Sequence, residues 1–60
     1  MATYYIKKDN AEQYFWVLKS SNGEIVCMSS ESYDSRQEVK KSINWTQANG
    51  KTTDIRDLTI

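Results

Sequence analysis

The stretch that decides the fold is residues 13–36, QYFWVLKSSNGEIVCMSSESYDSR. Two apolar runs flank Asn22 and Gly23, and both of these residues tolerate the positive φ that a tight hairpin turn requires. The pattern therefore predicts an antiparallel hairpin with strands over about residues 13–19 and 24–28.

Alternation along the hairpin divides its side chains between two faces. With a two-residue loop Leu18 faces Cys27; a four-residue loop keeps the same faces, and a three-residue loop exchanges them. In the first two cases one face collects Tyr14, Trp16, Leu18, Ile25 and Cys27, and the other collects Phe15, Val17, Val26 and Met28. The first face is strongly apolar and the second is at least half apolar, and one helix covers only one of them. We therefore expect a partner on the other.

The segment after the hairpin predicts one helix. Ser35 and Glu38 have the spacing of a capping box, in which each residue satisfies a backbone amide near the other. The helix is expected over about residues 36–49, with Gly50 as a left-handed terminator. Its apolar stripe is short, and Trp45 lies about 120° away from it.

Strands are also predicted at both ends of the chain. Residues 3–8 alternate in the manner of a first strand, and β-branched residues over 52–58 favour a last one. Ile55 and Leu58 cannot share a face of a regular strand, so this last strand has either a bulge or cover on both faces.

Size and composition restrict what stabilises such a fold. A chain of 60 residues makes one domain with a marginal core. Cys27 is the single cysteine and histidine is absent, so an internal disulfide and a zinc site are excluded. Association with another chain remains as the stabilising device, and Cys27 is expected to be a small core residue rather than a reactive thiolate.

Charge and hydropathy narrow the function. Eight basic residues balance eight acidic ones, which argues against polyanion binding as the main role. No apolar run reaches the ~20 residues of a membrane span and no signal peptide is visible, so a cytoplasmic location is expected. The residue inventory offers no catalytic base of the histidine type and no phosphate loop, so we expect no enzyme activity and no cofactor or metal.

Three runs of the sequence resemble the YegP-like family of small proteins of unknown function: YYIKKDNA at 4–11, YFWVLKSSNGEIV at 14–26 and SESYDSR at 30–36. The resemblance implies an α+β fold built from a β-β-β-α-β unit that is used in pairs. For one copy per chain it implies a homodimer with one continuous sheet and exchanged C-terminal strands. It supplies no catalytic or ligand-binding residues.

Four positions depart from the family pattern. Glu12 and Ser32 stand where glycine is usual, so the first turn must rearrange or hold Glu12 in a left-handed conformation at about 1–2 kcal/mol. Phe15 replaces a common arginine and Trp45 a small polar residue, and both add aromatic surface. A tryptophan off the core stripe favours an interface.

The sequence therefore predicts a non-enzymatic homodimer that acts as an interaction module, with an unknown protein as a further candidate partner. The alternative is a nucleic-acid-binding module on a three-stranded sheet, in which tyrosines interleaved with lysines stack on bases. Tyr33 is expected to pack against the helix. The interface candidates are Phe15, Val17, Met28, Trp45, Ile55, Leu58 and Ile60.

Overall fold

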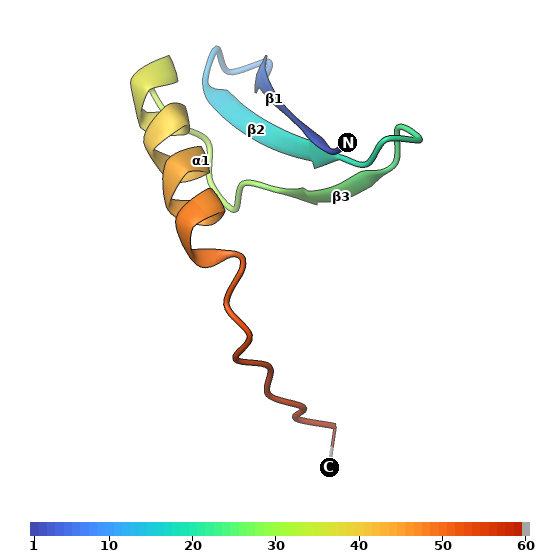
Figure 1. The fold of residues 1–60 in the computed structure, drawn as a ribbon. Coiled ribbons are helices and arrows are strands. Elements are labelled where there is room, and N and C mark those ends of the chain that lie inside the picture. The colour runs from blue at the N-terminus through green and yellow to red at the C-terminus, as the bar shows by residue number, and fades with distance from the viewer. Residues whose placement is uncertain (60) are drawn as a thin grey trace.

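The computed structural model, which describes residues 1–59, contains three antiparallel strands followed by one helix (Figure 1). The strands are β1 (Thr3–Lys8), β2 (Tyr14–Lys19) and β3 (Ile25–Met28), and the helix is α1 (Arg36–Asn49). The sheet order β1-β2-β3 makes β2 central and leaves β1 and β3 as the two edges. The expected α+β class is confirmed, and β2 and β3 each begin one residue later than expected.

The turn between β1 and β2 holds Glu12 in the left-handed region, with φ at 61°. The Glu12 N–H donates to the Asp9 carbonyl at 3.0 Å, and the Asp9 N–H donates to the Gln13 carbonyl at 2.8 Å. The Asp9 carboxylate also accepts hydrogen bonds from the Gln13 N–H, the Ser32 hydroxyl and the Ala11 N–H. These bonds, that of Gln13 foremost, hold the pKa of Asp9 below its ordinary value. The side chain of Asp9 thus fastens a turn that contains no glycine.

The turn between β2 and β3 repeats this backbone pattern with glycine in the strained position. Gly23 has φ at 87°, its N–H donates to the Ser20 carbonyl at 3.0 Å, and the Ser20 N–H donates to the Glu24 carbonyl at 2.9 Å. The loop therefore has three residues, with one left-handed residue at its end, and Asn22 does not have a positive φ.

A bulge in β3 restores the pairing that the three-residue loop would have shifted. Lys19 pairs with Ile25, as the loop dictates, but Leu18 pairs with Cys27, as expected for a two-residue loop. Val26 is the additional residue between the two pairs. Leu18 and Cys27 therefore lie on the same face after all.

The core lies between α1 and the centre of the sheet. Val39 of α1 is fully buried, and the buried Trp16 donates through Nε1 to the Ser42 hydroxyl at 2.8 Å. The Tyr33 hydroxyl donates to the same oxygen at 3.2 Å, so Tyr33 contacts the helix as expected. Tyr4 meets the Trp16 ring edge-on, with the centroids 5.3 Å apart. One helix serine thus anchors aromatic side chains from β2 and from the segment that leads into α1.

Both ends of α1 differ in detail from the expected caps. The Ser35 hydroxyl accepts from the Glu38 N–H at 3.3 Å, while the Glu38 carboxylate lies 3.5 Å from that same hydroxyl. Gly50 is right-handed, with φ at −68°, so its expected left-handed conformation is wrong. Its N–H donates to the Thr46 carbonyl, and a Cβ there would lie only 2.6 Å from that oxygen. Glycine is required by this close approach rather than by its φ.

The chain after α1 runs away from the rest of the molecule (Figure 1). Residues 52–59, here called the tail, form no helix or strand in the single chain, so the strand expected over 52–58 is not made within one copy. An exchanged strand requires a second copy to pair with, and it stays a prediction. Ile60 lies outside the described residues.

Candidate functional site

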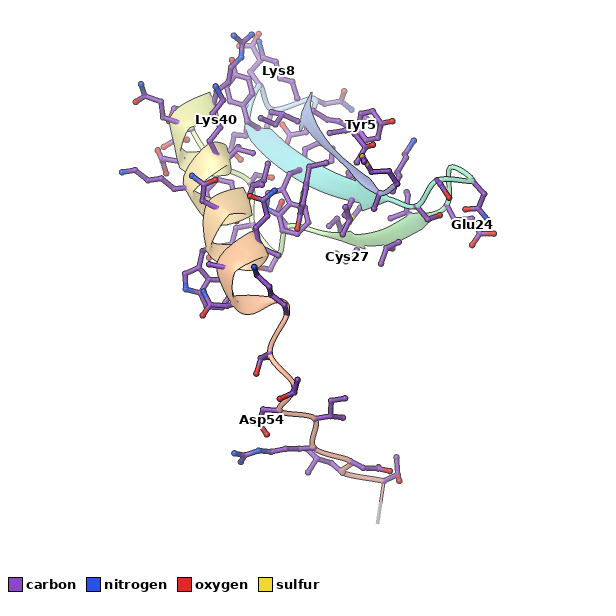
Figure 2. The ribbon with its side chains drawn as sticks, viewed as in Figure 1. Tyr5, Lys8, Glu24, Cys27, Lys40 and Asp54 are labelled. Carbon is purple, nitrogen blue, oxygen red and sulfur yellow. The ribbon has the colours of Figure 1, made fainter. Side chains whose placement is uncertain are left out.

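The most open part of the folded region is β3. Ile25, Val26 and Met28 are 58%, 61% and 53% exposed, and Cys27 between them is exposed as well. The expectation that Cys27 is a core residue is therefore wrong for the single chain. The physical reason is that α1 packs against β2 and β1, and Figure 2 shows Cys27 well apart from the helix.

The outer edge of β3 presents backbone groups ready to pair. The Ser29 N–H donates inward to the Trp16 carbonyl at 3.0 Å. Because inward and outward backbone groups alternate along an antiparallel strand, those of Met28 face outward. Residues 25–28 carry no charge, and charged side chains are a usual protection of such an edge. This edge is thus suited to pairing with another strand.

A cleft of about 500 Å³ adjoins the C-terminal end of β3. Its lining combines apolar side chains with hydroxyl-bearing ones: Trp16, Met28, Trp45, Ser29, Ser30, Tyr33, Ser42 and Thr46. Its lining residues come from β2, the last residue of β3, the segment after β3, and α1.

The polar groups of this cleft are largely engaged within the chain. The Ser42 hydroxyl accepts from Trp16 and Tyr33, and its carbonyl accepts from the Thr46 hydroxyl at 2.9 Å. The Ser29 hydroxyl donates to the Glu31 carbonyl at 2.9 Å. Since these groups already have partners, the apolar walls formed by the tryptophans and Met28 dominate what the cleft can bind.

The structure distributes the expected interface residues over three environments. Trp45 is 68% exposed on α1, off the buried stripe as expected, and Ile55 and Leu58 in the tail are 88% and 87% exposed. Phe15 is half-buried. Val17 is only 2% exposed, so it belongs to the core of the single chain rather than to a free surface.

Trp45 and Met28 come together at the cleft, which the sequence reasoning did not identify. A signal for it was present at Ser42, which lies beside Val39 and Ile43 of the apolar stripe. A hydroxyl in such a position indicates a nearby buried tryptophan or tyrosine that needs a partner.

Two of the lysines considered for nucleic-acid binding, Lys8 and Lys19, lie over tyrosine rings, as does Arg36. Lys8 and Arg36 lie 5.7 Å and 5.8 Å from the centroid of Tyr14, and Lys19 lies 5.5 Å from that of Tyr5. Such cation–π contacts hold the charges on the sheet surface. Lys8 and Arg36 share the ring of Tyr14, whereas Lys19 lies over that of Tyr5.

Within residues 1–59, no three side chains of the His, Cys, Asp and Glu types gather closely enough to hold a metal ion. The same part of the chain has no helix long and apolar enough to cross a membrane. The features left for a function are the β3 edge, its cleft and the exposed apolar residues of the tail.

Comparison with known proteins agrees with the fold. The NMR solution structure of a protein from Haloferax volcanii matches with a TM-score of 0.85 at 32% identity, over 93% of each chain. The UPF0339 protein plu2779 of Photorhabdus laumondii is 37% identical over 57 residues, which is 90% of this chain. The chain spans about half the length of that curated relative, 49%. A model of the domain of unknown function DUF1508 matches residues 9–57, so the chain belongs to the DUF1508 family, in agreement with its YegP-like resemblance.

Proposed function

We propose that this protein is a non-enzymatic interaction module that works as a homodimer, in which the tail of each copy completes the other. The proposal rests on one observation: the same chain exposes both a strand edge without a neighbour and an apolar tail without cover. An uncharged edge strand lies exposed at β3, and a tail with exposed Ile55 and Leu58 extends away from its own core.

The energetics favour association. Burying Ile55 and Leu58 would contribute roughly 1.5–3 kcal/mol each in transfer free energy, before the cost of ordering the tail. A domain of this size has a total stability of about 5–15 kcal/mol at best, so this contribution is a large fraction. With one free cysteine and no metal cluster in residues 1–59, burial against a second copy is the available stabilising device.

The family relationship supports a paired arrangement. The Photorhabdus relative is about twice as long as the stretch that matches, since this chain covers 49% of it. That length leaves room for a second unit in the same chain. Two copies of the present chain would provide the equivalent pair.

The test is the mass of the protein in solution. Sedimentation equilibrium at micromolar concentration should give twice the 7.0 kDa mass of one chain. A mass of one chain throughout that range would overturn the proposal.

The alternative function, nucleic-acid binding, is tested by fluorescence anisotropy with mixed oligonucleotides at about 0.15 M salt. Submicromolar affinity there would instead support a nucleic-acid-binding module.

A further inference from the structure

We propose that the face of the sheet turned away from α1 binds a short, extended acidic segment of another protein, in which two carboxylates flank an apolar side chain. This inference is independent of the homodimer, because it uses neither the β3 edge nor the tail.

The pleat of the sheet defines this face. Trp16 donates to Ser42 of α1, so the side of the sheet that carries Trp16 is turned to the helix. Successive side chains of a strand point to opposite faces, so Val17 and the residues in line with it point away from α1. Figure 2 shows Tyr5, the partner of Val17 on β1, well apart from the helix. The paired residues of this side, here called the bare face, are Thr3 with Lys19, Tyr5 with Val17, and Lys7 with Phe15.

The bare face is packed although α1 lies on the other side of the sheet. Val17 at its centre is only 2% exposed. Its neighbours in the register are Tyr5 on β1 and Met28 on β3, which are themselves 46% and 53% exposed. These larger side chains shield Val17 and present their outer surfaces to solvent. Side chains that are already held in place lose less conformational entropy on binding, and tyrosine, phenylalanine and methionine are enriched in interfaces.

The charge of the bare face is positive within a neutral chain. The three strands contain three lysines, Lys7, Lys8 and Lys19, and no acidic residue. All eight acidic residues of the chain lie outside these strands. Lys7 and Lys19 belong to the bare face, and the Lys19 Nζ lies 5.5 Å from the centroid of the Tyr5 ring, which keeps its charge over that face. A partner with two carboxylates and an apolar side chain is complementary to this surface.

The register sets the spacing that such a partner needs. Lys19 pairs with Thr3, which lies four residues before Lys7 on β1. Four residues of a strand span about 13 Å, at about 3.3 Å each. In an extended peptide the side chains at positions i, i+2 and i+4 lie on one side and cover the same length. The pattern acidic-x-apolar-x-acidic therefore places a carboxylate near each lysine and the apolar side chain over Tyr5 and Val17.

Other occupants suit the bare face less well. The affinity for a nucleic acid grows with the number of phosphates neutralised, and two lysines in a chain of balanced charge neutralise few. Lys19 also lies over the Tyr5 ring, on which a base would have to stack. A second copy would bring the same two lysines against them, and like charges repel.

Peptide titration of the ¹⁵N-labelled full chain, followed by NMR, tests the assignment. The probe is the capped peptide Asp-Thr-Leu-Thr-Asp. Two controls of the same length are the uncharged Asn-Thr-Leu-Thr-Asn and the rearranged Asp-Asp-Thr-Leu-Thr, whose carboxylates are adjacent. We expect saturable amide shifts on β1 and β2 with the probe, and binding about fivefold weaker or more with each control, as two exposed ion pairs allow.

Three results of the titration would overturn the inference. They are the absence of saturable shifts at millimolar probe, equal affinity for the three peptides, and shifts confined to α1 or to the cleft beside β3. Tighter binding of octathymidylate than of the probe to the same residues would assign the face to nucleic acid and overturn it as well.

Matched lysine variants locate the charges that bind the probe. Lys7→Gln with Lys19→Gln removes both charges of the bare face, and Lys40→Gln with Lys41→Gln removes two from exposed positions on α1. The first pair should weaken the probe about fivefold or more and leave the Asn peptide unchanged, and the second pair should change neither. Equal weakening by both pairs would contradict a site on the bare face. Circular dichroism checks that the variants fold, and the peptide series on the unaltered chain decides the matter where one does not.

Discussion

The molecule has one region whose apolar side chains are buried, here called the closed region, and one whose apolar side chains are exposed, here called the open region. In the closed region, which consists of β1, β2 and α1, Trp16, Val17 and Val39 are buried. In the open region, β3 and the tail expose nearly all of their apolar side chains. The two regions differ because α1 packs against β2 and β1 but not against β3.

The difference between the two regions shows how much of the sheet one helix covers. The buried side of α1 is narrow, because Val39 is its one fully buried side chain and Ser42 occupies the neighbouring position on the stripe. Its packing is directed at β2 and β1. A third strand is then held by backbone pairing but lacks cover. We infer that the closed region makes the fold and that the open region makes the contact with a second copy.

The largest effect is expected from removing the open region. Deletion of residues 52–60 should abolish the dimer and lower the free energy of unfolding by several kcal/mol, at roughly 1.5–3 kcal/mol for each apolar side chain lost. Sedimentation gives the association and circular dichroism gives the folding. If the shortened chain stays a folded dimer, the tail is dispensable and the open region has no role in association.

A substitution in the closed region should act on folding instead. Val39→Ala removes two methyl groups from a site with no exposure and should cost about 2–3 kcal/mol of unfolding free energy. Val26→Ala on the exposed β3 is the matched control and should cost less when the protein is studied below its dimer dissociation constant. Urea denaturation of both variants makes the comparison. Equal losses would mean that the two regions are equally packed.

Trp45 links the two regions, since it stands on α1 but lines the open cleft. Trp45→Ala should weaken the dimer about tenfold, or ~1.4 kcal/mol, without loss of helix content, because alanine is the better helix former. Asn44→Ala on the exposed side of α1 is the control and should leave the dimer constant unchanged. A lower melting temperature with an unchanged dimer constant would place Trp45 in the core.

The smallest change in stability is expected at the turns between β1 and β2 and between β2 and β3, which have the same geometry. Glu12 and Gly23 occupy the same left-handed position in turns with the same hydrogen bonds. Glu12→Gly should therefore stabilise the fold by up to about 1 kcal/mol, and Gly23→Ala should destabilise it by about 1 kcal/mol. Thermal unfolding measures both. A destabilised Glu12→Gly protein would show that the Asp9 bonds already offset the strain.

The strands and the helix could be predicted from the sequence because their signals are local. Alternation marks the strands, and Ser35 with Glu38 marks the start of the helix. The wrong predictions concern residues whose burial or conformation depends on contacts with other segments of the chain. Cys27 is exposed because α1 does not cover β3, and Val17 is buried although it lies on the face opposite Trp16. Gly50 is set by the approach of the Thr46 carbonyl, and no nearby residue type signals this.

The candidate site was predictable in its parts but not in its assembly. Met28, Trp45, Ile55 and Leu58 could be singled out as apolar residues without cover in the expected elements. That Met28 and Trp45 share a cleft depends on the angle at which α1 crosses the sheet, which a sequence pattern does not specify.

The central claim is that the tail of one copy lies on β3 of another. Isotope-filtered NMR on a dimer mixed from ¹³C-labelled and unlabelled chains tests it most directly. The account predicts Overhauser contacts between the methyl groups of Ile55 and Leu58 in one chain and residues 25–28 and Trp45 in the other. Contacts of the tail confined to its own chain, or a dimer whose tails contact neither copy, would contradict it.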